Sequence, residues 1–274
     1  DEYYGVHLAS GSLEGGVLSF ARNVPVLENG EWTNKNYYYL MCSYGSLSSA
    51  YNMRCGRSEK PQGPYVDVNG NPLVCSTDIG TGNKMLGSFR WEEDPVDYYC
   101  PGHNDMFETK GVRLISYHCR TNYFIDKKLS RSNNFHYLYL SQYDLNSDGW
   151  PVMNPNRYAG EEIQDVTADE LLNVSAGKFE AVLFRQGVDE LTAQRVVLKK
   201  DGTMDGAFKG TWRMYDSRYI SIETQGDEYL GVVMPAWIDH QNAAGITVSA
   251  MGRRSGMALI MNSTNKIMNC QTKC

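Results

Sequence analysis

The apolar residues of this chain fall in short runs that alternate with polar residues, a pattern typical of β-strands. In residues 136–143, for example, aromatic and aliphatic side chains recur with period two. Residues 146–149 end in an Asp-Gly pair that favours a tight hairpin turn. We therefore predict an all-β fold in the first half of the chain. The expected strands, separated by Gly, Asn or Pro turns, are 24–28, 37–44, 51–57, 104–108, 112–119 and 136–143.

A second series of strands follows residue 161 at short, regular spacing, which is typical of a small antiparallel barrel. One helix-like turn at 167–172 precedes it, where Thr167 and Glu170 have the spacing of a capping box. The sequence therefore predicts two domains, 1–161 and 162–274. The expected strands of the second domain are 177–184, 193–199, 206–212, 219–223, 228–234 and 245–250.

Composition agrees with an all-β protein and excludes some function classes. The 274 residues include 19 tyrosines and 26 glycines, which suits short strands joined by tight turns. A formal charge of −6 argues against a nucleic-acid-binding protein, which normally has a basic face. No run of eighteen apolar residues occurs, so we expect no membrane span. No signal peptide is visible, so we expect a mature or processed form.

Four cysteines flank two predicted hairpins. Cys42 and Cys55 lie on either side of one turn, and Cys100 and Cys119 on either side of another. Counting outward from each turn places the members of a pair opposite each other. Opposed residues in antiparallel strands come within about 4.5–5.5 Å, so disulfides are geometrically possible. The alternative is that all four are small buried hydrophobic residues.

One histidine is set in a sequence that fixes its direction. His103 follows Pro101-Gly102, where the backbone must turn sharply, and a strand-like run ending at Arg120 comes soon after. A histidine held in this way can approach a ligand or a metal ion from one defined direction. A hydrogen-bonded structural histidine is the alternative.

The residues around this histidine resemble a known family. Residues 101–104 and 117–120 are similar to the "PGHN … YHTR" pair of the family 43 arabinanases, glycoside hydrolases that cut arabinan. Three further segments resemble that family in the same order. They are 37–45 (its "YYYLFVSYG" strand), 51–58 with 63–67 (its "YNMRVARS … GPYYD"), and 148–152 with 157–161, which close its catalytic domain.

The resemblance implies a five-bladed β-propeller, of which residues 1–161 can hold only about the last two blades and part of a third. It also implies that the second domain is the lipocalin-like domain that follows the propeller in many arabinanases. The Trp-Gly-containing last strand of that domain is replaced here by 257–262. The missing blades, from the same gene or from another chain, are the expected partner. Cys270 and Cys274 could add a covalent link.

Glycoside hydrolysis needs two carboxyl groups, which inverting enzymes hold about 6.5–9.5 Å apart to admit a water. By the resemblance, the general base and an Asp that tunes the acid both precede the region covered here. The general acid is a Glu in an "EGP" or "EAP" motif. Glu14 preserves the Glu-Gly pair but requires a longer hairpin. Alternatively Asn23 occupies the slot, keeps the usual spacing and loses the acid.

The resemblance implies three further site residues. His103 corresponds to a histidine at the propeller axis that helps to hold a calcium ion, mainly with waters. Tyr44 and Gly45 match positions near the substrate cleft, where Tyr44 could stack on a sugar or simply pack.

The resemblance leaves two functions open. The first is the C-terminal part of a secreted endo-arabinanase-like glycoside hydrolase that cleaves α-1,5-arabinan with inversion. The second is a noncatalytic carbohydrate-binding or structural-assembly protein derived from that fold. We expect this chain alone not to hydrolyse arabinan, because the general base and the Asp that tunes the acid lie outside it.

Overall fold

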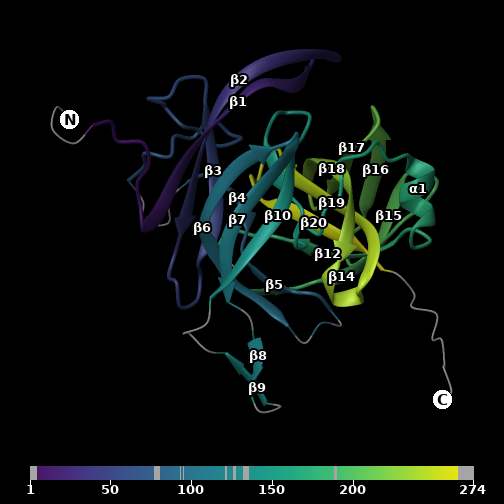
Figure 1. The fold of residues 1–274 in the computed structure, drawn as a ribbon. Helices are drawn as coiled ribbons and strands as arrows, with labels where there is room; N and C mark the ends of the chain where they lie inside the picture. The colour runs from purple at the N-terminus through teal and green to yellow at the C-terminus, as the bar shows by residue number, and fades with distance from the viewer. Residues whose placement is uncertain are drawn as a thin grey trace.

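The first half of the chain forms two open sheets in this computed structural model, and these are antiparallel apart from one parallel edge strand that comes from the second half (Figure 1). The structure describes residues 5–76, 81–92, 94, 96–120, 122–125, 128–131, 136–187 and 190–264. The first sheet has the order β1 (Leu13–Glu28), β2 (Glu31–Tyr44), β3 (Asn52–Ser58), β4 (Asn83–Leu86). The second sheet has the order β11 (Pro151–Met153), β10 (Tyr137–Leu145), β7 (Val112–Arg120), β6 (Asp97–Thr109), β5 (Ser88–Arg90), β13 (Glu190–Thr192). A small sheet pairs β8 (Asn122–Ile125) with β9 (Lys128–Arg131).

A closed barrel of eight antiparallel strands forms the second half. Its interior is filled by an apolar cluster that includes Phe179 and Trp212. The predicted strand 206–212 is wrong, because it is two strands separated by a turn. Gly206 has a φ of 107°, and a Cβ on Gly210 would lie 1.8 Å from the Glu223 carbonyl oxygen. The barrel strands are β12 (Lys178–Leu183), β14 (Gln194–Leu198), β15 (Thr203–Gly206), β16 (Gly210–Tyr215), β17 (Tyr219–Thr224), β18 (Asp227–Ile238), β19 (Ala243–Gly252) and β20 (Ala258–Ser263).

The strand predictions for the first half are confirmed in type, but two strands are much longer than expected. β1 begins at Leu13, and its first half alternates between exposed and half-buried residues. That segment contains two glycines and has little apolar patterning, so only its pairing with β2 makes it a strand. β6 runs through Pro101, because the register shifts on both sides of Gly102 and such bulges tolerate proline.

From Tyr37 onward, the side chains of β2 are mostly buried and point alternately into two different cores. Tyr37, Tyr39 and Met41 pack into the main core, which lies between the two open sheets and the barrel. Leu40 and Tyr44 face the other way, into a small cluster with Tyr65 and Leu73. At β2, the first sheet therefore packs against the main core on one face and against the small cluster around Tyr65 and Leu73 on the other.

Cys42, Cys55, Cys100 and Cys119 are buried thiols without a disulfide, so the alternative of four small buried residues is correct. Cys42 lies opposite Arg54, whereas Cys55 lies opposite Met41, because Tyr44 pairs with Asn52 across the turn. The two thiols therefore lie on opposite faces of the sheet. Near Cys100 the register of β6 shifts, and that residue has a φ of 51°. Cys270 and Cys274 lie outside the described residues.

The barrel packs against both sheets and is not separated from them. The main core contains Val182 and Met234 of the barrel beside Tyr39 and Tyr117 of the open sheets. β13, which follows the first barrel strand, adds to the second sheet by parallel pairing with β5. The long β1–β2 hairpin also reaches towards the barrel (Figure 1), where the Trp32 and Tyr219 rings are 4.8 Å apart. The division of the chain at residue 161 stays a prediction.

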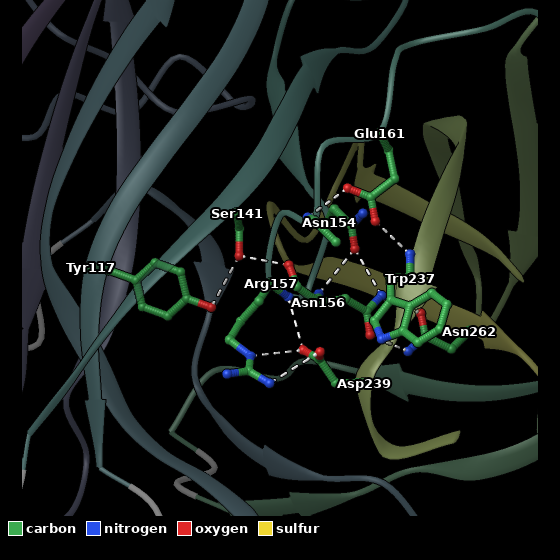
Figure 2. Close-up of polar contacts among 10 residues, drawn as sticks. Tyr117, Ser141, Asn154, Asn156, Arg157, Glu161, Trp237, Asp239 and Asn262 are labelled. Atoms are coloured by element: carbon green, nitrogen blue, oxygen red, sulfur yellow. Dashed lines mark hydrogen bonds and ion pairs between the residues drawn. The ribbon is translucent and has the colours of Figure 1, made fainter. Parts of the chain in front are cut away.

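A buried polar network holds the barrel against the segment that follows β11 (Figure 2). The Asn156 amide donates to Asn262 Oδ1 at 3.0 Å and accepts from Asn262 Nδ2 at 2.9 Å, and both side chains are buried. At its edge, the Arg157 guanidinium pairs with Asp239 at 3.2 Å. Buried amides are costly unless they are paired, so this reciprocal pair favours one placement of the barrel.

The helix α1 (Ala168–Asn173) begins with the predicted capping box. Thr167 Oγ1 accepts from the Glu170 N–H at 3.2 Å, and the Glu170 carboxylate accepts from the Thr167 N–H at 2.7 Å. No helix among the described residues is long and apolar enough to span a membrane.

We predict that Thr167→Ala lowers the free energy of unfolding by about 1 kcal/mol, because one N–H of the first helical turn loses its acceptor. Urea unfolding followed by circular dichroism measures this change. Thr167→Ser is the matched control, since it keeps the hydroxyl. Equal stabilities of the Ala and Ser variants would contradict the prediction.

Candidate active site

Glu14 and His103 meet where the start of β1 lies beside β6. Glu14 is paired with Ser43 of β2, and a bulge follows it at Gly15-Gly16. A Cβ on Gly15 would lie 3.3 Å from the His103 ring, so the two strands approach closely here. Glu14 Oε1 is 4.0 Å from His103 Nδ1, and each side chain is more than half exposed. The structure thus brings together the two residues predicted as general acid and metal ligand.

Backbone geometry fixes the direction of His103. Its φ is 51°, and its N–H donates to the buried Ser43 hydroxyl at 2.7 Å. A Cβ on the preceding Gly102 would lie 2.1 Å from the Tyr51 ring, so only glycine fits at this position. The sequence analysis predicted that a sharp turn at Pro101-Gly102 fixes the direction of the His103 side chain. The structure places it within a bulged strand instead of a loop.

Tyr51 is a site residue that the sequence analysis did not identify. It directly precedes β3, and its hydroxyl donates to Glu14 Oε1 at 2.6 Å. Burial raises the pKa of Tyr51, and the hydrogen bond to Glu14 raises it further, so the phenol stays protonated. The register of the β2–β3 hairpin could have identified Tyr51. That register places Tyr51 near the end of β2, and Glu14 pairs with the same end.

Two further histidines lie behind this group. The Arg120 Nε–H donates to His136 Nε2 at 3.2 Å, so the proton of His136 is on Nδ1. His136 Nδ1 is 3.2 Å from His118 Nδ1, which must therefore accept. Burial, together with the nearby His136, His103 and Arg120, lowers the pKa of His118 to about 4. His118 is neutral at pH 7, as this hydrogen bond requires.

The prediction that Tyr44 contacts the substrate needs correction. The Tyr44 ring is 1% exposed and lies under the Arg54 guanidinium at 4.8 Å, so it presents no face to a sugar. Gly45 has a φ of 87°, and a Cβ there would lie 2.5 Å from the Ala50 carbonyl oxygen. Tyr44 therefore has a packing role, whereas Gly45 is required by the turn and its contact with a substrate stays a prediction.

Asn23, the alternative occupant of the acid position, lies in a different part of the molecule. It is exposed at the second bulge of β1, between Ala21 and Val24, and its N–H donates to Asn36 Oδ1. Its neighbours on β2 belong to the outer part of the β1–β2 hairpin. Of the two aligned residues, only Glu14 is beside His103.

The described residues do not make a calcium site by themselves. Ca²⁺ takes six to eight oxygen ligands. Among the residues that the structure describes, no group of three His, Cys, Asp or Glu side chains could hold a metal ion. His103 offers one imidazole, and Glu14 is the nearby carboxylate. The buried Asn104 amide, next to His103, has no hydrogen-bond partner in the described part of the chain.

Comparison with known proteins identifies both halves of the chain. Residues 20–151 match the model of glycosyl hydrolases family 43, and residues 155–261 match its C-terminal lipocalin-like domain. The extracellular endo-α-(1→5)-L-arabinanase 2 of Bacillus subtilis is 31% identical over 223 residues, which are 73% of this chain and 45% of that protein. The extracellular endo-α-(1→5)-L-arabinanase of Thermotoga petrophila is 31% identical over 74% of this chain and 45% of its own length. The chain thus spans about half the length of these curated relatives.

Solved structures agree with these matches. The family 43 YxiA protein of Bacillus licheniformis superposes on 96% of this chain and 58% of its own, with a TM-score of 0.80 and 28% identity. The endo-1,5-α-L-arabinanase of Thermotoga petrophila superposes over the same shares, with a TM-score of 0.78 and 25% identity. These neighbours confirm the predicted fold class, all-β with part of a propeller followed by an antiparallel barrel. The chain belongs to the glycosyl hydrolases of family 43.

Proposed function

We propose that this chain is the C-terminal part of a secreted endo-1,5-α-L-arabinanase that cleaves α-1,5-arabinan with inversion. The observation that carries the proposal is the position of the Glu14 carboxylate beside His103, where the first sheet meets the second. The relatives support the substrate and the location, because both bacterial proteins are named as extracellular arabinanases. Relatives with such names favour an enzyme over a noncatalytic carbohydrate-binding or assembly protein.

In this proposal Glu14 is the general acid. It is half exposed, so a glycosidic oxygen can reach it, and it gives its proton to the leaving oxygen as the bond breaks. The general base that activates water belongs to the part of the propeller outside this chain. An inverting enzyme needs both carboxyl groups, with space for the water between them. This chain alone therefore supplies half of the catalytic pair.

His103 is the proposed link to a calcium ion in the complete propeller. This chain offers one imidazole towards such an ion. Calcium prefers oxygen, so waters and residues of the other blades would supply the remaining ligands. The ion would stabilise negative charge close to the bond that is cleaved.

The other blades are the proposed partner, from the same gene or from another chain. Leu18 and Phe20 of β1 are 47% and 43% exposed, and Leu138 of β10 is 78% exposed. Large apolar side chains on open sheets mark surfaces that bind further protein. Propeller blades pack face to face, so missing blades would cover them.

Arabinan hydrolysis by the complete protein, compared with this chain alone, tests the proposal. We expect the complete protein to release arabino-oligosaccharides whose new reducing ends first appear in the inverted anomeric form. The isolated chain should release none, because it lacks the base. Chromatography measures the release of oligosaccharides, and proton NMR at early times identifies the anomeric form of the new reducing ends. Turnover by the isolated chain, or none by the complete protein, would contradict the proposal.

A further inference from the structure

Tyr51 is held more rigidly than a surface tyrosine that happens to reach a carboxylate. Its side chain is 2% exposed, and its ring stacks on His118 with centroids 5.7 Å apart and planes 14° apart. On another side the ring fills the space that a side chain at Gly102 would occupy. His118 is itself held by its hydrogen bond with His136. The phenol therefore has one position from which to donate.

The hydroxyl of Tyr51 engages one oxygen of Glu14 and leaves the other available. Tyr51 donates to Oε1 at 2.6 Å, a length typical of a hydrogen bond to a charged oxygen. Oε2 has no hydrogen-bond partner among the described residues, and the Glu14 side chain is 55% exposed. Since Oε1 accepts from the phenol, the proton of a protonated Glu14 is on Oε2, which can face a ligand.

We propose that Tyr51 is a positioning residue for the general acid Glu14, an inference that rests on the proposed function. Tyr51 fixes the carboxyl rotamer, directs the Oε2 proton to the glycosidic oxygen and stabilises the carboxylate that forms as the proton leaves. The O–H bond of Oε2 breaks, a new O–H bond forms on the leaving oxygen, and Tyr51 keeps its own proton. A hydrogen bond that strengthens as charge develops lowers the barrier more than it aids substrate binding.

The first test measures the contact without using activity. The complete protein is labelled with carbon-13 at the glutamate side-chain carboxyls, and Glu14→Gln identifies the Glu14 signal. Loss of a donor to the carboxylate disfavours the ionised form. We expect the midpoint of the Glu14 titration to rise by about half to one pH unit in Tyr51→Phe. Tyr65→Phe is the matched control, because that buried hydroxyl donates to the Pro61 carbonyl instead.

The second test measures the role in catalysis. For linear arabinan, we expect Tyr51→Phe to lower kcat by about 10-fold with little change in KM, the usual effect of losing a hydrogen bond to a charged group. The alkaline limb of the pH profile should move upward. For 4-nitrophenyl arabinoside the loss should be much smaller, because that leaving group needs little help from an acid. A merely structural tyrosine would affect both substrates equally.

The outcomes separate this inference from the proposed function. An unchanged Glu14 titration in Tyr51→Phe overturns the inference, whatever the activity. Equal losses on both substrates also overturn it. If the wild-type protein cleaves no arabinan, the proposed function fails and the catalytic role of Tyr51 fails with it. A shifted titration would then still establish the pairing of Tyr51 with Glu14.

Discussion

Glu14→Gln is expected to lower kcat of the complete protein on linear arabinan by about 10²- to 10⁴-fold. The amide keeps the size of the side chain and can still accept from the Tyr51 hydroxyl, but it has no proton to give to the leaving oxygen. The alkaline limb of the pH profile, which reports the protonated acid, should disappear. Reducing-sugar release across a pH series measures both effects.

Asn23→Asp is the control that separates the two alignments of the acid motif. Asn23 lies at the outer bulge of β1, away from His103, so a new carboxylate there should leave kcat unchanged and should not restore Glu14→Gln. An active Glu14→Gln variant would show that Glu14 is not the acid. Rescue by Asn23→Asp would favour the alternative alignment.

Removal of the Asp144 carboxylate is expected to destabilise the protein by about 3 kcal/mol, at the lower end for a buried ion pair that loses one partner. Asp144 is 1% exposed and accepts from Arg113 Nη1 at 2.6 Å. Arg218 of the barrel approaches its other oxygen at 3.0 Å. Asp144→Ala would leave two arginines without their shared anion. We expect a loss at the lower end of the range because the Arg113 and Arg218 side chains are about one quarter exposed, so water still solvates them in part.

Urea unfolding of Asp144→Ala, followed by tryptophan fluorescence, measures this loss. Asp205→Ala is the matched control, because Asp205 pairs with Lys199 on the surface, where water screens the charges. We expect that variant to unfold at the same urea concentration as the wild type. A loss in Asp144→Ala no larger than in the control would show that the buried pair contributes little.

Local features of the sequence predicted the elements whose cause is local. The capping box of α1 needs only Thr167 and Glu170, three residues apart, and it formed as predicted. The period-two alternation predicted β10, since alternate residues of a strand lie on opposite faces. The alternation of apolar and polar residues is weakest in the first half of β1, which has two glycines and no fully buried residue. There the partner strand, not the local sequence, determines the structure.

The candidate site was only partly predictable for the same reason. Glu14 and His103 were singled out by motif resemblance, but nothing local showed that they meet. Tyr44 was wrongly expected to face a sugar, because a motif names a residue but not the side of the strand on which its ring is buried. Of the two alternatives for Cys42 and Cys55, buried thiols are correct, because a register that differs by one residue moves one thiol to the opposite face.

The sequence by itself determined the all-β class, the series of strands, the helix cap and the resemblance to family 43, because these depend on nearby residues or on ordered motifs. Only the tertiary structure decided which distant side chains meet. Tyr51 and Glu14 are 37 positions apart, and Asn156 and Asn262 are 106 positions apart. Such contacts depend on strand register and on how sheets pack, and both are set by the free energy of the whole core.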